Sequence, residues 1–117
     1  MNQRYVGARG EQLAREYLEQ HGGSVIDHNF HSRYGEIDLI IRKHRAYRFV
    51  EVKFRSTDDY GIPQESVVAR KQQKIRKTAL IWLKQRHLPM DSEIHFDVLG
   101  ISLMSGQLQY EYIEDAF

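Results

Sequence analysis

Hydrophobic residues recur with two different spacings along the chain, and these predict two helices and five strands. Leu13 and Tyr17 are one helical turn apart, which places them on the same face of a helix that a pair of glycines ends. Ile37, Leu39 and Ile41 alternate with Glu36 and Asp38 instead, which is typical of a strand with one apolar face. In chain order we expect a helix over residues 3–20, strands over 24–33, 35–42 and 46–54, a helix over 67–87, and strands over 93–103 and 107–113.

This order predicts an α/β fold in which helices cover a mixed central sheet, with a loop over residues 56–65. Of the 117 residues 41% are hydrophobic and 28% are charged, so we expect residues 1–117 to form a single globular domain. No run approaches the about 18 consecutive apolar residues that a membrane span needs. The absence of cysteine excludes disulfides, thiolate zinc sites and cysteine nucleophiles, and we expect a cytoplasmic protein.

Charge is distributed unevenly, although the formal net charge is only +1. Seven lysines and arginines and no acid lie between Ser66 and Met90, whereas six acids and no lysine or arginine lie between Asp91 and Phe117. The second predicted helix therefore carries a basic face, which is typical of a surface that contacts nucleic-acid phosphates. A solvated helix surface without a partner would have the same composition.

The hairpin of the second and third predicted strands carries the most chemical information. A two-residue turn at positions 44–45 would place Asp38 opposite Glu51, with Cβ atoms about 4.5–5.5 Å apart on one side of the sheet. Two carboxylates so placed repel unless a cation lies between them. Mg²⁺ prefers such oxygen ligands and usually takes one or two carboxylates together with water and phosphate. The alternative is a solvated sheet face on which acids and bases form a ladder of salt bridges.

The same register places Glu36 opposite Lys53, which lies two residues beyond Glu51 on the same face. The Lys53 ammonium would then reach the expected cation site. There it could orient or help deprotonate a water, or stabilise negative charge that develops on a phosphate. Glu36 would lie beside the pair of acids and form a salt bridge to Lys53.

Three segments carry a family resemblance: residues 7–14 (GARGEQLA), 35–40 (GEIDLI) and 49–55 (FVEVKFR). With the Phe-Asp-Val segment at 96–98, they make residues 7–103 similar to the YraN-type family of uncharacterised bacterial proteins. That family resembles the PD-(D/E)xK nuclease superfamily, which includes restriction endonucleases and archaeal Holliday junction resolvases. The resemblance implies a restriction-endonuclease-like single domain with a mixed central sheet, flanking helices and the order α-β-β-β-α-β-β.

The resemblance also implies roles for individual residues. Asp38 and Glu51 fill the positions of the metal-binding acids, which hold Mg²⁺ or Mn²⁺, and Lys53 fills that of the catalytic lysine. Glu11 matches the acid of the first helix that joins the metal site in resolvase-like members. An ordinary ion pair within the helix is the alternative for Glu11. Glu36 matches the family motif and is expected in an outer position around the metal ligands.

By this resemblance we expect a metal-dependent nuclease that hydrolyses phosphodiester bonds in DNA, including branched or structured DNA, and that forms a homodimer as resolvase-like members do. Asp97 is expected to make a structural hydrogen bond, and Trp82 to lie in the core. Two alternatives stay open: an inactive DNA- or RNA-binding module with a vestigial metal site, and an interaction protein whose hairpin acids are only structural. The residues expected to contact phosphates are Arg9, Arg55, Arg70, Lys71, Lys74 and Lys77.

Overall fold

The computed structural model describes residues 3–55 and 68–117, and the elements follow the predicted order. The predicted loop over residues 56–65 lies outside the described residues. Among the described helices, none is long and apolar enough to cross a membrane. The elements are α1 (Gln3–Gln20), β1 (Ser24–Ser32), β2 (Gly35–Lys43), β3 (Ala46–Arg55), α2 (Ala69–Gln85), β4 (Ile94–Met104) and β5 (Gln107–Ile113).

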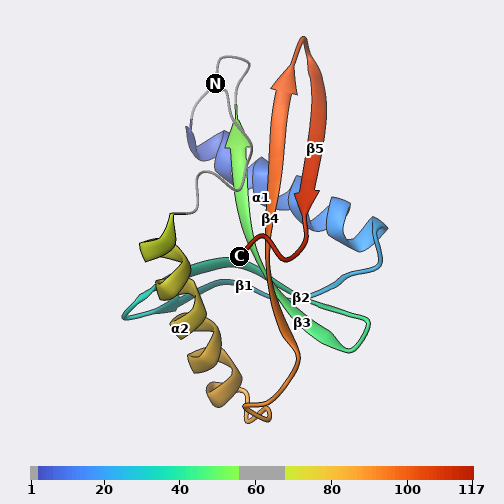
Figure 1. Ribbon diagram of the computed structural model, residues 1–117. Helices are drawn as coiled ribbons and strands as arrows, with labels where there is room; N and C mark the ends of the chain where they lie inside the picture. The colour runs from blue at the N-terminus through green and yellow to red at the C-terminus, as the bar shows by residue number, and fades with distance from the viewer. Residues whose placement is uncertain (1–2, 56–67) are drawn as a thin grey trace.

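The five described strands form one mixed sheet in the order β1-β2-β3-β4-β5 (Figure 1). β3 and β4 are parallel, whereas the other neighbouring strands are antiparallel. Parallel neighbours need a crossover connection, and α2 lies in the stretch of chain between β3 and β4. The predicted α/β fold with a mixed sheet and flanking helices is confirmed.

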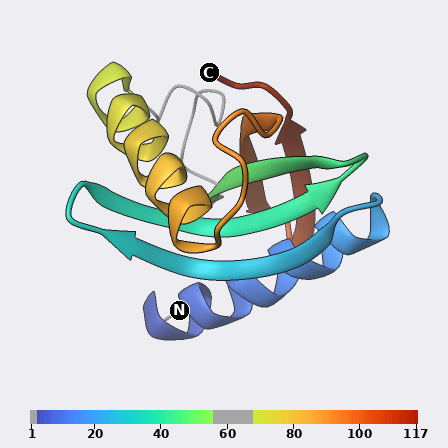
Figure 2. The same ribbon diagram turned by 90° about the horizontal axis from the view of Figure 1, so that it is seen from below.

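The two helices cover opposite faces of this sheet (Figure 2). On one face Leu18 of α1 packs with Leu39 of β2 and Val50 of β3. On the other face Trp82 of α2 packs against Phe49 of β3, with the two ring centroids 5.6 Å apart. Trp82 is only 1% exposed, so the prediction that it belongs to the core is confirmed.

The β2–β3 hairpin has the predicted turn. His44 and Arg45 have φ angles of 51° and 68°, the left-handed conformation that a two-residue hairpin turn of type I′ requires at both positions. From this turn the antiparallel pairing runs to Leu39 opposite Val50, in the predicted register. The local sequence therefore sets the alignment of the two strands that carry the candidate acids.

Regular alternation along β2 is interrupted at Asp38. Its neighbour across the β1–β2 pair is Asn29, which lies in the left-handed region with φ of 47°. Asparagine adopts that conformation more readily than most residues. Leu39 packs in the cluster under α1, whereas Ile37 packs in the cluster under α2. The prediction that Ile37 and Leu39 share one apolar face was wrong, because this interruption lies between them.

Candidate active site

Asp38 lies just beyond the last paired residues of the β2–β3 hairpin. Its Oδ2 accepts a hydrogen bond from the backbone N–H of Val52 at 2.8 Å. From here β3 continues beside β4 as far as Arg55, whereas the β1–β2 hairpin runs away from it (Figure 1). The Asp38 side chain thus contacts the β3 backbone at the point where the two strands part.

The same divergence changes the surroundings of Glu36. Its Oε1 lies 3.5 Å from Nε2 of His31 on the neighbouring β1 strand. Neither predicted opposition, of Asp38 with Glu51 or of Glu36 with Lys53, is found in the strand register, because the pairing of β2 with β3 ends at Leu39 and Val50. Burial is the main cause of the raised pKa of Asp38, and the negative charge of Glu36 adds to it.

Asp38 and Glu51 form a pair of acids in a poorly solvated position. Glu51 is only 5% exposed and Asp38 is partly buried. Burial raises the pKa of Glu51 above its ordinary value, and the nearby charge of Asp38 raises it further. Burial likewise raises the pKa of Asp38, and the hydrogen bond from Val52 offsets this only in part. The fold therefore concentrates negative charge where water stabilises it poorly, which favours binding of a cation.

Two lysines partly balance that charge. Nζ of Lys71, in the first turn of α2, lies 2.9 Å from Oε2 of Glu51. The charges of Lys71 and Lys53 both lower the pKa of Asp38 and of Glu51, although burial outweighs them. The structure thus brings together the predicted residues Asp38, Glu51 and Lys53. It adds Lys71, which the sequence suggests only as a phosphate contact.

A pocket of about 220 Å³ opens beside Asp38, between α1 and the sheet. Its walls come from α1, β1, β2 and β3, so the four elements meet at this point. It is large enough for several water molecules, each of which occupies about 30 Å³ in the liquid. The lining residues are Gly10, Glu11, Asn29, Asp38, Leu39, Val52 and Phe54.

Glu11 reaches this pocket from α1, as expected if it joins Asp38, but its carboxylate already has neighbours. Oε1 lies 3.0 Å from Nδ1 of His28 and 3.5 Å from Nε of Arg15, and Oε2 accepts a hydrogen bond from Asn29 at 3.4 Å. The helical ion pair considered as the alternative is therefore present as well. Within residues 3–55 and 68–117, no group of three or more histidine, aspartate or glutamate side chains is arranged to hold a metal ion.

The residues predicted to contact phosphates fall on two sides of the site. Arg70, Lys74 and Lys77 are exposed on α2, and Arg9 is exposed on α1 beside the pocket. Arg55 is partly buried at the end of β3. The basic face expected on the second helix is thus present, at the same helix that supplies Lys71.

The turn between β1 and β2 extends this basic face. Nζ of Lys77 lies 5.0 Å from the centre of the Tyr34 ring, and the guanidinium carbon of Arg33 lies 4.8 Å from it. The guanidinium of Arg33 also donates a hydrogen bond to the Tyr34 hydroxyl at 2.7 Å. A cationic surface with an aromatic ring therefore connects α2 to the end of β2 that leads to Asp38.

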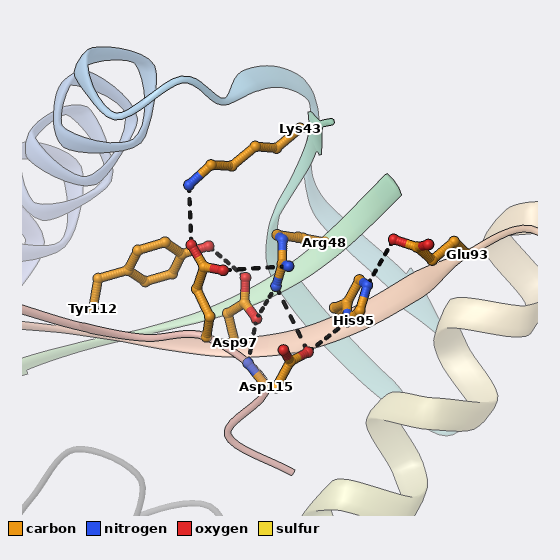
Figure 3. Close-up of polar contacts among 8 residues, drawn as sticks. Lys43, Arg48, Glu93, His95, Asp97, Tyr112 and Asp115 are labelled. Atoms are coloured by element: carbon orange, nitrogen blue, oxygen red, sulfur yellow. Dashed lines mark hydrogen bonds and ion pairs between the residues drawn. The ribbon is translucent and has the colours of Figure 1, made fainter. Parts of the chain in front are cut away.

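A second polar cluster surrounds Asp97, which lies opposite Val50 in the parallel pairing of β3 and β4 (Figure 3). Asp97 is fully buried and accepts hydrogen bonds from the Arg48 guanidinium at 3.0 Å, the Asp115 backbone N–H at 2.9 Å and the Tyr112 hydroxyl. The structural role predicted for Asp97 is confirmed. The partners were not identified from the sequence, because they come from β3, β5 and the C-terminal segment and share no local motif.

Comparison with known proteins identifies the family. The model of the uncharacterised protein family UPF0102 matches residues 10–101. A UPF0102 protein of Geobacter metallireducens is 42% identical over 118 residues, which cover 100% of this chain and 95% of that protein. One of Rhodococcus opacus is 45% identical over 115 residues, which cover 96% of this chain and 95% of that protein.

Among solved structures, Pyrococcus furiosus SfsA in complex with Ca²⁺ matches with a TM-score of 0.41 and 18% identity, covering 97% of this chain and 64% of that one. A likeness at that level carries no conclusion about function. The family match spans most of the chain and includes Glu11, Glu36, Asp38 and Glu51. This chain therefore belongs to the UPF0102 family, the YraN-type family that its sequence motifs resemble.

Proposed function

We propose that the protein is a metal-dependent nuclease that hydrolyses phosphodiester bonds in DNA. The observation that carries the proposal is the position of Asp38, which bonds to the Val52 N–H where β2 and β3 part and raises the pKa of the neighbouring Glu51. A fold gains no stability from two partly desolvated acids at one point. Their placement is explained if they serve a cation.

The residues present fit Mg²⁺ or Mn²⁺. Asp38 and Glu51 supply hard carboxylate oxygens, which these ions prefer, and the pocket beside Asp38 has room for the waters that Mg²⁺ keeps. Asp38 and Glu51 would hold the ion. Asp38 and Glu11 line the pocket on the α1 side, whereas Glu51 lies outside its lining and contacts Lys71 of α2. Bound there, the ion would lower the pKa of a water and stabilise negative charge on phosphate oxygens.

The chain's own groups would hold the substrate and the water. Lys53 lies on β3 near both acids, where its ammonium can orient a water or stabilise charge on a phosphate oxygen. Arg70, Lys74 and Lys77 on the exposed face of α2 would contact backbone phosphates without reading sequence. Tyr34, next to Lys77, adds an aromatic surface on which a base can stack.

Cleavage of labelled DNA tests the proposal. Purified protein is incubated with single-stranded, duplex and four-way DNA in Mg²⁺ or Mn²⁺, and we expect at least one of them to be cut. Asp38→Asn should abolish cleavage, and Lys53→Met should slow it by about 10²-fold or more while the DNA stays bound. Glu111→Gln removes an exposed carboxylate of β5 and is the matched control, which should cut as the unmodified protein does.

A nucleic-acid-binding module without catalysis is the second candidate. It is favoured by the Lys71 ammonium, which already neutralises Glu51 without any metal. In that case DNA or RNA would bind with a steep salt dependence, and no substrate would be cut in either metal. If neither nucleic acid nor metal binds at moderate salt, an interaction protein with structural acids is left.

A further inference from the structure

We propose that Lys71 is a displaceable counter-ion, which holds Glu51 until a divalent cation takes its place and which then contacts the phosphate of the nucleic acid. The inference rests on the proposed function, because it needs a cation at Asp38 and Glu51. It assigns Lys71 a positioning role that links metal binding to substrate binding.

The two ends of the Lys71–Glu51 ion pair differ in how firmly they are held. The Glu51 side chain is 6% exposed. It belongs to β3, which pairs with β4 along the stretch that contains Glu51. The Lys71 side chain is 39% exposed and begins in the first turn of α2. The carboxylate is therefore fixed by the sheet, whereas the ammonium ends a flexible stem that reaches solvent. Only the lysine can leave this pair without unfolding part of the core.

Charge balance gives the reason for such a pair. A buried carboxylate without a partner strongly destabilises the folded state, so about one counter-charge is needed at Glu51 in the absence of metal. Lys71 supplies it at 2.9 Å. A divalent ion at Glu51 and Asp38 brings twice that charge and repels the ammonium beside it. The metal and Lys71 therefore compete for the same carboxylate.

Once displaced, the Lys71 ammonium can contact a phosphate bound at the basic face of α2. Arg70 immediately precedes Lys71 on α2, Lys74 follows it by one turn, and both are exposed on the basic face of the helix. A phosphate drawn to that face and to the metal would lie within reach of Lys71. Binding of the metal should therefore strengthen binding of the nucleic acid, and by linkage the nucleic acid should strengthen binding of the metal.

Calorimetric titration of the nucleic-acid-free protein with Mn²⁺ tests the competition. Lys71→Met keeps the length of the stem and removes the charge, and we expect it to bind Mn²⁺ about ten-fold more tightly. Lys71→Arg keeps the charge on a planar guanidinium, which can donate two hydrogen bonds to a carboxylate. We expect this variant to bind Mn²⁺ about three-fold more weakly. Lys84→Met removes an exposed charge from the far end of α2 and should leave the affinity unchanged.

Lys71→Arg controls for misfolding, because it leaves Glu51 paired even if Lys71→Met loses stability.

A second experiment measures binding of a single-stranded oligonucleotide in EDTA and in Ca²⁺. The tightening caused by Ca²⁺ should be several-fold smaller in Lys71→Met than in the unmodified protein.

Three outcomes overturn the inference, and they distinguish its own failure from the failure of the proposed function. If the unmodified protein binds Mn²⁺, Asp38→Asn abolishes that binding, and neither Lys71 variant changes it, then Lys71 does not compete and only this inference fails. Weaker Mn²⁺ binding by Lys71→Met would also overturn only this inference, because it would show that Lys71 supports the metal site instead of competing for it. If the unmodified protein binds no Mn²⁺, the proposed function fails and this inference with it.

Discussion

Oδ2 of Asp38 accepts the hydrogen bond of the Val52 N–H at 2.8 Å, at the point where β2 stops pairing with β3. One side chain thus satisfies a backbone group of the neighbouring strand and turns towards the pocket beside α1. A carboxylate can accept several bonds at once, so this contact leaves Asp38 able to bind a cation.

Two substitutions at Asp38 should therefore separate folding from activity. Asp38→Asn keeps an oxygen that can accept from Val52 and removes a charge beside Glu51, so its free energy of unfolding should equal or exceed that of the unmodified protein. Asp38→Ala leaves the Val52 N–H without this acceptor and should lose about 1–3 kcal/mol. Urea denaturation measures both values, and both variants should lack cleavage. Equal destabilisation of the two variants would contradict the role of the hydrogen bond.

The basic face of α2 should be visible in the salt dependence of nucleic-acid binding. Lys74→Ala removes one exposed cation from this face, so the slope of log affinity against log salt should fall by about one unit. Lys84→Ala, at the other end of the helix, serves as the control and should leave the slope unchanged. Fluorescence anisotropy at several salt concentrations gives both slopes. A slope that is the same in the two variants would place the nucleic acid on another surface.

The cluster around Asp97 should matter for stability and not for chemistry. Asp97→Ala leaves Arg48, whose side chain is only 12% exposed, without its buried partner, and it should cost about 3–5 kcal/mol of unfolding free energy. Tyr112→Phe removes one hydrogen bond to the same carboxylate and should cost about 1–2 kcal/mol. Thermal and urea denaturation measure these losses. A folded Asp97→Ala variant with unchanged stability would show that the network contributes little.

The stability of the fold should also depend on pH through His95, whose ring lies between Glu93 and Asp115 (Figure 3). Its ring nitrogens lie 2.9 Å from Glu93 and 2.5 Å from Asp115. The contact with Glu93 raises the pKa of His95 above its ordinary 6.5, and Asp115 raises it further, while partial burial and the charge of Arg48 act in the opposite direction.

A raised histidine pKa stabilises the fold only while the ring is protonated. The contribution should be fully present below pH 6.5 and disappear as the pH rises through the higher pKa of the folded state. His95→Gln cannot titrate, so its melting temperature should fall less than that of the unmodified protein over this range. Melting curves from pH 6 to 9 compare the two proteins. Parallel curves would mean that His95 makes no contribution that depends on protonation.

The fold was largely predictable because its signals are local. The alternation of apolar residues indicates the strands, and residues 44–45 set a turn whose register holds as far as Leu39 and Val50. The divergence beyond that pair was not predictable, because it depends on packing against α1 and on Asn29, which lies in another strand.

The candidate site was predictable in part for the same reason. Asp38, Glu51 and Lys53 belong to one hairpin, so a single turn places them on neighbouring strands, although the register that it sets ends at Leu39 and Val50. Lys71 approaches Glu51 only after the chain has left the sheet and formed α2, and no local pattern encodes that contact. A basic helix suggests phosphate binding in general, whereas an ion pair with one buried acid depends on how the helix is placed against the sheet.

The central claim is that Asp38 and Glu51 together hold a divalent cation. Crystals grown with Mn²⁺, with diffraction recorded near the manganese absorption edge, locate that ion without reference to any activity. We predict an anomalous peak within coordination distance of a carboxylate oxygen from each residue, and its loss in Asp38→Asn. Protein saturated with Mn²⁺ that shows no peak between these two acids, or a peak only elsewhere, would contradict the account.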